Sequence, residues 1–258
     1  MAIAVDRAIA MSERHGPGQV LVVFDLDSTL LRDPERSPDL DALEASDPSR
    51  FPQVERTVMY LKSLVPTERG LTGQIERLRA VGIPAYLLTA RGHDMRDMTL
   101  REMSANGIAL PPAPECGPPL CIGRGKIGAV EVMDAATQIV GATELGRVGF
   151  DRGRDITVWD GIVMAAGLDK GVLMRTLGGS LGVDIKGYVF IDDAAKNTEA
   201  VARASQAMRE EVAIFQYRSP EKTEVRSQAQ ADHAWDRARE GICVAFAPRW
   251  CPKAASED

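Results

Sequence analysis

Apolar residues along this chain fall into two patterns, short continuous runs and helical spacings. Continuous runs of strand length, rich in β-branched residues, predict strands at residues 20–24, 83–88, 188–191 and 212–217. Runs without polar alternation are typical of strands that are buried on both faces of a parallel sheet. Apolar positions at helical spacing predict helices at 3–14, 72–80, 94–105, from about 172 onward, and 197–209. This alternation predicts an α/β fold in which crossover helices connect a parallel sheet.

Three segments depart from this alternation. The β-prone runs at 156–159 and 162–165 are joined by Asp160-Gly161, which predicts a hairpin. Residues 111–119 are rich in proline, which argues against a central strand there. The letters of residues 123–128 match G-x-G-x-x-G, but a loop precedes them instead of a strand, so we expect no dinucleotide site.

Composition and charge mainly exclude certain partners and cellular locations. The chain has 258 residues, of which 45% are hydrophobic and 26% charged, as in a soluble globular protein. Its net charge is −6 without a basic stripe, so we expect no nucleic-acid partner. No apolar run is long enough for a membrane helix, and residues 1–16 do not resemble a secretory signal. We therefore expect a cytoplasmic protein with no membrane partner; export through another signal and the oligomeric state stay open.

The four cysteines do not follow a structural zinc pattern. Cys116 and Cys121 have the spacing C-x4-C, and Cys243 and Cys251 have the spacing C-x7-C. Structural zinc sites use shorter C-x2-C pairs. A disulfide between Cys116 and Cys121 is geometrically possible in their loop of prolines and glycines, but we expect unpaired thiols.

Polar residues follow three of the apolar runs directly. Asp25 and Asp27 come after the first run, Thr89 after the second, and the pair Asp192-Asp193 after the third. Ligands of open α/β sheets bind at the carboxyl ends of the strands, and parallel strands bring these ends to one edge. Lys170, at the start of a later helix, can reach the same edge.

Carboxylates that are held together repel one another unless a cation joins them. Oxygen ligands of this kind suit Mg2+, which also retains waters and a phosphate oxygen. Asp25 next to Mg2+ can attack phosphorus, while Lys170 and the Thr89 hydroxyl offset the charge of the phosphoryl group. Asp27, two residues after Asp25, faces the same way in an extended strand and can act as the acid and base.

Each of these residues taken alone has a simpler structural explanation. An Asp-x-Asp after a strand is most often a turn or a helix cap, and a single lysine is most often a solvated surface residue. The joint occurrence of the residues, in order and at strand ends, favours an active site. Arg91 and His93 either touch substrate or belong to a helix N-terminal turn, and Asn197 either orients Asp193 or Lys170 or caps a helix.

These residues resemble the four motifs of the haloacid dehalogenase-like (HAD) superfamily. Val-Val-Phe-Asp25-Leu-Asp27-Ser-Thr-Leu is similar to its D-x-D-x-T motif, Leu-Leu-Thr89 to the second motif, Asp169-Lys170-Gly to the third, and Phe-Ile-Asp192-Asp193 to the acidic fourth. Thr89-Ala-Arg-Gly and the hairpin before Asp169 resemble one uncharacterised bacterial branch, a domain-of-unknown-function group.

The resemblance implies a role for each of these residues. Asp25 would be the nucleophile and a Mg2+ ligand, and Asp27 the acid and base whose main-chain carbonyl binds the metal. Thr89 and Lys170 would hold the phosphoryl group, and Asp192 and Asp193 would complete the metal site. The residues expected to bind a small phosphorylated substrate are Thr89, Ala90, Arg91 and Lys170.

The resemblance also implies a Rossmann-like three-layer sandwich with small cap insertions, as one HAD-like domain over residues 1–258. Residues 31–70, polar and irregular at 32–49 with a helix expected at 53–64, are a candidate lid, and residues 107–150 are a second candidate cap. The implied activity is a Mg2+-dependent phosphatase that acts through an aspartyl-phosphate. A phosphotransferase with the same intermediate and a non-catalytic binding or effector protein are the alternatives, whereas the acid at Asp27 argues against a dehalogenase.

Overall fold

The protein is described by a computed structural model at residues 1–36, 63–121, 125–220, 224–225 and 229. The chain divides into two compact units, one of residues 1–32 and 65–221 and one of residues 33–64 and 222–258. In the second unit, β3 (Glu35–Arg36) pairs in parallel with β11 (Glu224–Val225). Residues 53–62 of the helix expected at 53–64 lie outside the described residues, as does most of the polar tail expected at 218–238.

A seven-stranded sheet forms the centre of the first unit, in the order β10-β9-β1-β5-β8-β7-β6. Its strands are β1 (Val20–Phe24), β5 (Ala85–Thr89), β6 (Gly125–Ile127), β7 (Ile156–Trp159), β8 (Ile162–Met164), β9 (Gly187–Asp192) and β10 (Glu211–Gln216). Of these seven strands, β7 alone runs against the others, because it pairs antiparallel with both β8 and β6. The predicted α/β fold with a central, mostly parallel sheet is therefore confirmed.

The strand β1 lies in the middle of the sheet, as its uninterrupted apolar run predicts. Val22 pairs with Ala85 of β5 on one side and with Val189 of β9 on the other. All five residues of β1 are buried. The chain passes from β1 to β5 and β8 on one side and later crosses to β9 and β10 on the other. The carboxyl end of β1 is thus a topological switch point, where open α/β sheets bind ligands.

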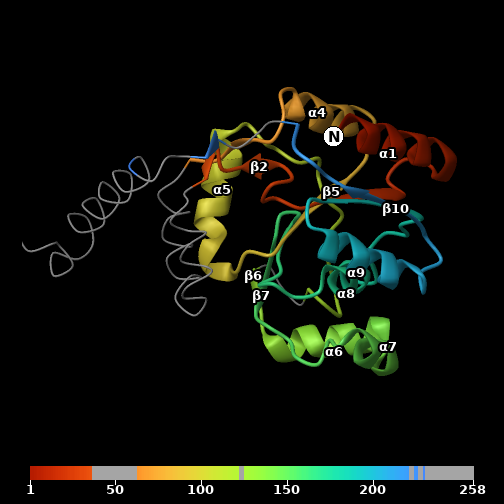
Figure 1. Ribbon diagram of the computed structural model, residues 1–258. Coiled ribbons are helices and arrows are strands. Elements are labelled where there is room, and N and C mark those ends of the chain that lie inside the picture. Colours follow the sequence, from red (N-terminus) through yellow and green to blue (C-terminus); the bar gives the residue numbers. More distant parts are fainter. Residues whose placement is uncertain (37–62, 122–124, 221–223, 226–228, 230–258) are drawn as a thin grey trace, which may run out of the picture. The chain divides into compact units, whose positions relative to one another are not determined.

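Helices cover both faces of the sheet and give three layers (Figure 1). The helices of this unit are α1 (Ala2–His15), α4 (Leu71–Ala80), α5 (Arg96–Ala105) after the 3-10 turn η1 (His93–Met95), α6 (Ala129–Val140), α7 (Ala142–Val148), α8 (Lys170–Gly178) and α9 (Ala195–Ser205). Helix α1 packs against α4, β1 and β9, whereas α8 packs against α6 and α9. Leu21 and Val23 belong to the hydrophobic cluster that includes residues of α6 and α8. Because side chains alternate along a strand, the other residues of β1 face the opposite helix layer.

The segment 107–150 contains structure that the sequence does not predict. After the proline-rich loop, β6 extends the sheet next to β7, and α6 and α7 follow. Val132 and Ala136 of α6 belong to the same buried cluster as α8. The described part of this segment is thereby packed into the unit, and its role as a cap stays a prediction.

The segment 31–70 leaves and re-enters the first unit at neighbouring points. Strands β2 (Leu31–Arg32) and β4 (Val65–Pro66) pair antiparallel, with Leu31 opposite Pro66. The excursion between them leaves from the loop that directly follows Asp25 and Asp27. Its role as a lid also stays a prediction, because residues 37–62 are outside the described part of the chain.

The cysteines correct one expectation. Cys116 and Cys121 form a disulfide, with their Cα atoms 5.6 Å apart, where unpaired thiols were expected. Five residues of separation in a loop of glycine and proline bring the two side chains together. Cys243 and Cys251 lie outside the described residues. In the described part of the chain, no helix combines the length and apolar character needed to cross a membrane.

Candidate active site

Two adjacent strands deliver the acidic residues of the site. Asp25 directly follows β1, and its N–H donates to the carbonyl oxygen of Ile191 in β9 at 2.9 Å, which continues the ladder to the sheet edge. Asp192 is the last residue of β9. After Asp25 the chain turns sharply through Ser28, whose φ of 60° is left-handed. After this turn, the Thr29 hydroxyl lies within hydrogen-bonding distance of Asp25 and of the backbone of Asp193.

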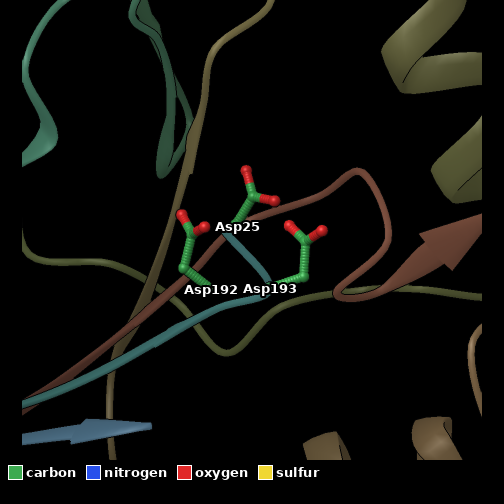
Figure 2. Close-up of side chains that lie close together, drawn as sticks. All are labelled: Asp25, Asp192 and Asp193. Atoms are coloured by element: carbon green, nitrogen blue, oxygen red, sulfur yellow. The ribbon is translucent and has the colours of Figure 1, made fainter. Parts of the chain in front are cut away.

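Three carboxylates converge at this edge (Figure 2). Asp25, Asp192 and Asp193 each offer an oxygen, and the three oxygens lie within 4.8 Å of one another. Asp25 and Asp192 are 5% and 0% exposed, whereas Asp193 is half-buried. A hard divalent cation takes oxygen ligands of this kind, and it offsets the repulsion between them. The buried acidic cluster is therefore suited to hold a metal ion.

Lys170 neutralises part of this cluster. Its Nζ donates to Asp25 Oδ1 at 2.6 Å and to Asp192 Oδ2 at 2.7 Å, and the residue is 2% exposed. Lys170 is the first residue of α8, and the helix begins there because Asp169 accepts from the N–H of Val172 at 2.9 Å as its N-cap. A lysine that is buried this deeply requires carboxylate partners, and both are supplied by strand ends.

Polar neighbours fix the orientation of the carboxylates. Asn197 of α9 donates its side-chain N–H groups to both oxygens of Asp192, at 2.9 and 3.0 Å, and the N–H of Ala194 donates to Oδ1 at 2.9 Å. The Thr29 hydroxyl donates to Asp25 Oδ2 at 3.3 Å and accepts from the N–H of Asp193 at 3.0 Å. Asn197 thus orients Asp192, where Asp193 or Lys170 was the expected partner. Thr29 connects the D-x-D-x-T motif to the acidic fourth motif.

Burial changes the acidity of the cluster. Desolvation raises the pKa of Asp25 to about 7; the ammonium of Lys170 opposes this change, and the charge of Asp192 adds to it. Burial, followed by the charge of Asp192, also raises the pKa of Asp193. Perturbed carboxylates that gather in one cluster are characteristic of functional sites.

Asp27 does not point into this cluster. Both of its oxygens accept from Arg91, Oδ2 from Nε at 2.9 Å and Oδ1 from Nη2 at 2.6 Å. Arg91 is 4% exposed, and its Nη1 donates to the Thr99 hydroxyl of α5 at 2.9 Å. The bidentate fork holds the Asp27 carboxylate in one orientation, with part of it accessible to solvent.

The residues around the predicted phosphate-binding segment differ in burial and in their contacts. Thr89 is buried at the end of β5, and its hydroxyl accepts from the N–H of Arg91 at 3.2 Å. Ala90 is exposed at the same edge. His93 lies 2.7 Å from the Thr157 hydroxyl through Nδ1, so its described contact is with β7.

The site contains residues that the sequence analysis did not assign to it. Thr29 is part of the D-x-D-x-T pattern, so the motif itself carries a signal for this residue. Thr99 has no such signal, because it lies on α5 and is connected to Asp27 only through the buried side chain of Arg91. The contact of Arg91 with Asp27 joins residues 64 positions apart, and no local pattern encodes it.

Comparisons with known proteins give a family but little about activity. No curated protein is a match for the chain. The structure titled as the Class C acid phosphatase from Bacillus anthracis is similar over 93% of this chain and 84% of its own, with 14% sequence identity and a TM-score of 0.39. The model of the family described as "Protein of unknown function (DUF2608)" matches residues 4–240, and the chain belongs to that family.

Proposed function

We propose that this protein is a Mg2+-dependent phosphohydrolase that forms an aspartyl-phosphate on Asp25. The observation that carries the proposal is Lys170, which is buried between Asp25 and Asp192 in a cluster where oxygens of three carboxylates lie within 4.8 Å of one another. A carboxylate nucleophile, a fixed ammonium and an oxygen cluster for a cation are the groups that phosphoryl transfer requires. Their order along the chain supports the same class of reaction, because it follows the four motifs described above.

In the first step, an oxygen of Asp25 attacks phosphorus, and the bond between phosphorus and the ester oxygen breaks. Lys170 already lies 2.6 Å from Asp25, so its ammonium can balance the charge of the incoming phosphoryl group. Thr89 ends β5, the strand next to β1, and a rotation of its hydroxyl would direct a hydrogen bond toward a phosphoryl oxygen. Lys170 and Thr89 would together position the group for in-line attack.

Asp27 would move the protons of both steps. As the substrate binds, Asp27 would take up a proton from solvent and donate it to the leaving ester oxygen. As a carboxylate again, it would then take a proton from the water that hydrolyses the aspartyl-phosphate. The Arg91 fork holds Asp27 as an oriented carboxylate, which is the form required to activate water. Arg91 would thus act through Asp27, in addition to the predicted contact with substrate.

The donor set fits Mg2+. Asp25, Asp192 and Asp193 would hold the ion through carboxylate oxygens, with waters and a phosphate oxygen in the other positions. A bound Mg2+ would supply charge that offsets the repulsion between the Asp25 carboxylate and the phosphoryl group. Asp193 is half-buried and Asp192 is fully buried, so Asp193 is the more accessible of the two.

Turnover of phosphate esters tests this proposal. The purified protein should release inorganic phosphate from p-nitrophenyl phosphate or from a member of a broad panel of phosphomonoesters, with Mg2+ present and not with EDTA. Asp25→Asn should abolish the release while the far-UV circular dichroism and the melting temperature stay near those of the wild type. Asp134→Asn, a matched change at an exposed position of α6, should keep full activity. Full activity of Asp25→Asn would rule out the mechanism.

The analysis of products separates the alternatives. Free phosphate as the product supports a phosphohydrolase, whereas a phosphorylated alcohol that forms when acceptors are added supports a phosphotransferase. Binding without turnover of any ester would support a non-catalytic protein.

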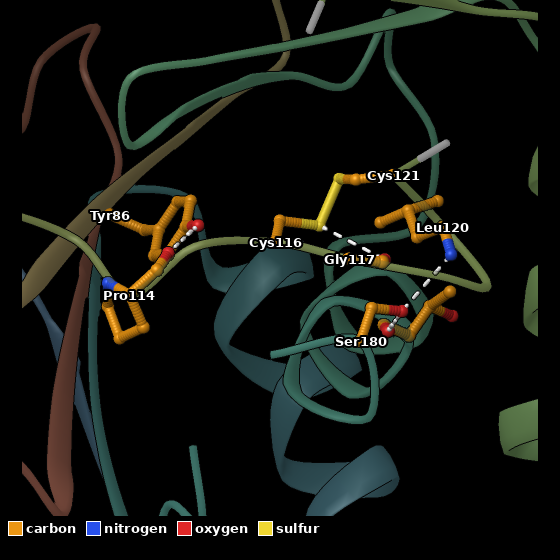
Figure 3. Close-up of a disulfide and its surroundings, with 8 residues drawn as sticks. Tyr86, Pro114, Cys116, Gly117, Leu120, Cys121 and Ser180 are labelled. Atoms are coloured by element: carbon orange, nitrogen blue, oxygen red, sulfur yellow. Dashed lines mark hydrogen bonds between the residues drawn. A yellow bond between two sulfur atoms is a disulfide. The ribbon is translucent and has the colours of Figure 1, made fainter. Parts of the chain in front are cut away.

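The predicted partner of this protein is a small phosphorylated molecule. The Cys116–Cys121 disulfide (Figure 3) argues against the predicted cytoplasmic location, because disulfides are rare in the cytosol.

A further inference from the structure

The strand β10 forms one outer edge of the seven-stranded sheet. Among the described strands, β10 pairs only with β9, which lies on one side of it. The N–H of Glu211 donates to the carbonyl oxygen of Lys186 at 3.0 Å, just before β9. Successive residues of a strand direct their backbone groups to opposite sides. The residues of β10 whose N–H and C=O groups point away from β9 are therefore Val212, Ile214 and Gln216.

This edge lacks the features by which proteins usually protect an exposed strand. Lysine, proline and β-bulges keep edge strands from pairing with other chains. The strand β10 has six residues in continuous register with β9, and its sequence, Glu-Val-Ala-Ile-Phe-Gln, contains neither lysine nor proline. The opposite edge, β6, is only three residues long and contains Lys126. Of the two edges, β10 is therefore the one suited to accept a further strand.

The apolar side chains of β10 are only partly covered. All four apolar residues of the strand are partly exposed, whereas every residue of the neighbouring strand β9 is buried. Val212 and Ile214 pack against the core cluster on one face of the sheet. Ala213 and Phe215 face the opposite helix layer, because side chains alternate along a strand. A further strand at this edge would cover apolar surface on both faces.

The side chains along this edge suit a second copy of the same strand. In an antiparallel pair centred on Ile214, residues equally far from Ile214 in the two copies lie opposite each other. Ala213 then lies opposite Phe215, and Glu210 lies opposite Arg218. In the part of the chain that the structure describes, neither Glu210 nor Arg218 belongs to an ion pair, and Arg218 is exposed. The pairing thus combines an apolar centre with opposite charges at both ends.

The helix α9 leaves room for the second copy. It lies over both β9 and β10, and neighbouring strands are about 4.8 Å apart, so the axes of α9 and its copy would lie about 10 Å apart, a normal helix-packing distance. Ala200 and Ala204 face α8, because both lie against Gly171. Ala195 and Ala202 lie on the opposite side of α9, and both are exposed. Their small side chains allow the two helices to approach.

We propose that β10 is a dimerisation surface, at which the β10 strands of two copies of this chain pair antiparallel about Ile214 and join their sheets. The outward N–H and C=O groups of Val212, Ile214 and Gln216 form the new hydrogen bonds. The proposal rests on the edge of the sheet, so it stands even if the protein is not a phosphohydrolase.

Sedimentation equilibrium of the full-length protein tests the association. The chain has a mass of 27.9 kDa, and a species of twice this mass should be populated at micromolar concentration. Hydrogen–deuterium exchange of the peptide that covers residues 211–217 should be slower in the dimer than in the diluted monomer. The proposal is overturned if the protein stays monomeric at several hundred micromolar. It is also overturned if the peptide is equally protected in the monomer, because another segment of the same chain would then cover the edge.

Charge-reversal variants locate the interface. Glu210→Arg alone and Arg218→Glu alone each place like charges opposite one another twice in the dimer, and each should raise the dimer Kd at least about tenfold. An equimolar mixture of the two variants should form a heterodimer with a Kd near that of the wild type, because each reversed charge then meets an opposite charge. Arg152→Glu, an exposed change before β7, is the matched control and should leave the Kd unchanged.

The mixture keeps the test decisive, because its recovery shows that both variants are folded. A dimer that neither variant weakens would place the interface elsewhere and contradict the proposal. A mixture that associates no more tightly than either variant alone would contradict it as well.

Discussion

At the scale of single residues, two aspartates only two positions apart acquire different chemistry from their partners. Asp25 is buried beside Asp192 and Lys170, whereas Asp27 is half-exposed and is held by the fork of Arg91. An extended strand would direct both side chains the same way. The strand ends at Phe24, before both aspartates, and the two carboxylates are held by different partners. The motif identifies both residues, but the partners come from distant parts of the chain.

The raised pKa of Asp25 predicts how the metal-free protein responds to pH. Its pKa is about 7 in the folded protein and about 3.9 in an unfolded chain, so folding favours the protonated form. The stability that this group contributes is therefore complete below about pH 4 and is lost as the pH rises toward 7. Urea unfolding in EDTA between pH 5 and 8 should show this loss, and Asp25→Asn should show less of it than Asp134→Asn. Equal pH dependence in the two variants would contradict the assignment.

The fork of Arg91 predicts an effect on turnover. Arg91→Met leaves Asp27 without its two charged hydrogen bonds, and Arg91→Lys replaces a planar fork with a single ammonium. Misplacement of the acid and base should lower kcat about 100-fold in Arg91→Met, and Arg91→Lys should restore only part of that loss. Steady-state kinetics, together with melting curves, separate this effect from unfolding. The prediction fails if Arg91→Met keeps the kcat of the exposed control Arg152→Met.

At the scale of elements, α8 is the helix on which the site depends most. It begins with Lys170, and its next residue, Gly171, allows the backbone of α9 to approach closely. A Cβ atom at Gly171 would lie 2.7 Å from the carbonyl carbon of Ala200, closer than real contacts permit. The sequence predicts a helix from about residue 172, but not that Gly171 belongs to it or faces another helix, since that depends on how α8 and α9 pack.

Gly171→Ala should therefore destabilise the protein by about 1–3 kcal/mol, because backbone atoms of α9 must shift. The shift should also move Lys170 and reduce turnover. Gly73→Ala is the matched control, since Gly73 is exposed in α4 with open space around it, and this change should be neutral or stabilise by up to about 1 kcal/mol. Guanidinium unfolding measures both variants. Equal stability of the two would show that α8 and α9 are not in close contact at Gly171.

At the scale of the whole molecule, the sequence predicts the parallel strands better than the excursions between them. Val20 to Phe24 form an uninterrupted apolar run, and this run becomes the central strand with all five residues buried. Helices α6 and α7 follow a loop of prolines and glycines, and the sequence predicts no helix or strand there. The order of the strands is also not a local property, because it depends on where each crossover returns.

Beyond the strands, the sequence also predicts some features of the candidate site and its surroundings and not others. Asp25, Asp192 and Asp193 stand at strand ends in the sequence, and the structure brings them within 4.8 Å. The sequence predicts their convergence because carboxyl ends of parallel strands share one edge. The disulfide between Cys116 and Cys121 was not expected, since spacing alone does not decide whether two thiols are oxidised.

Detection of a phosphoryl group on Asp25 tests the central claim most directly. The protein is mixed with Mg2+ and the phosphate ester that it turns over best, quenched with acid within milliseconds to seconds, digested, and examined by mass spectrometry. The account predicts a phosphoryl group on the peptide that contains Asp25, lost on treatment with hydroxylamine and absent from Asp25→Asn. Steady turnover with no phosphoryl group on that peptide at any quench time, or with the group on another residue, would contradict it.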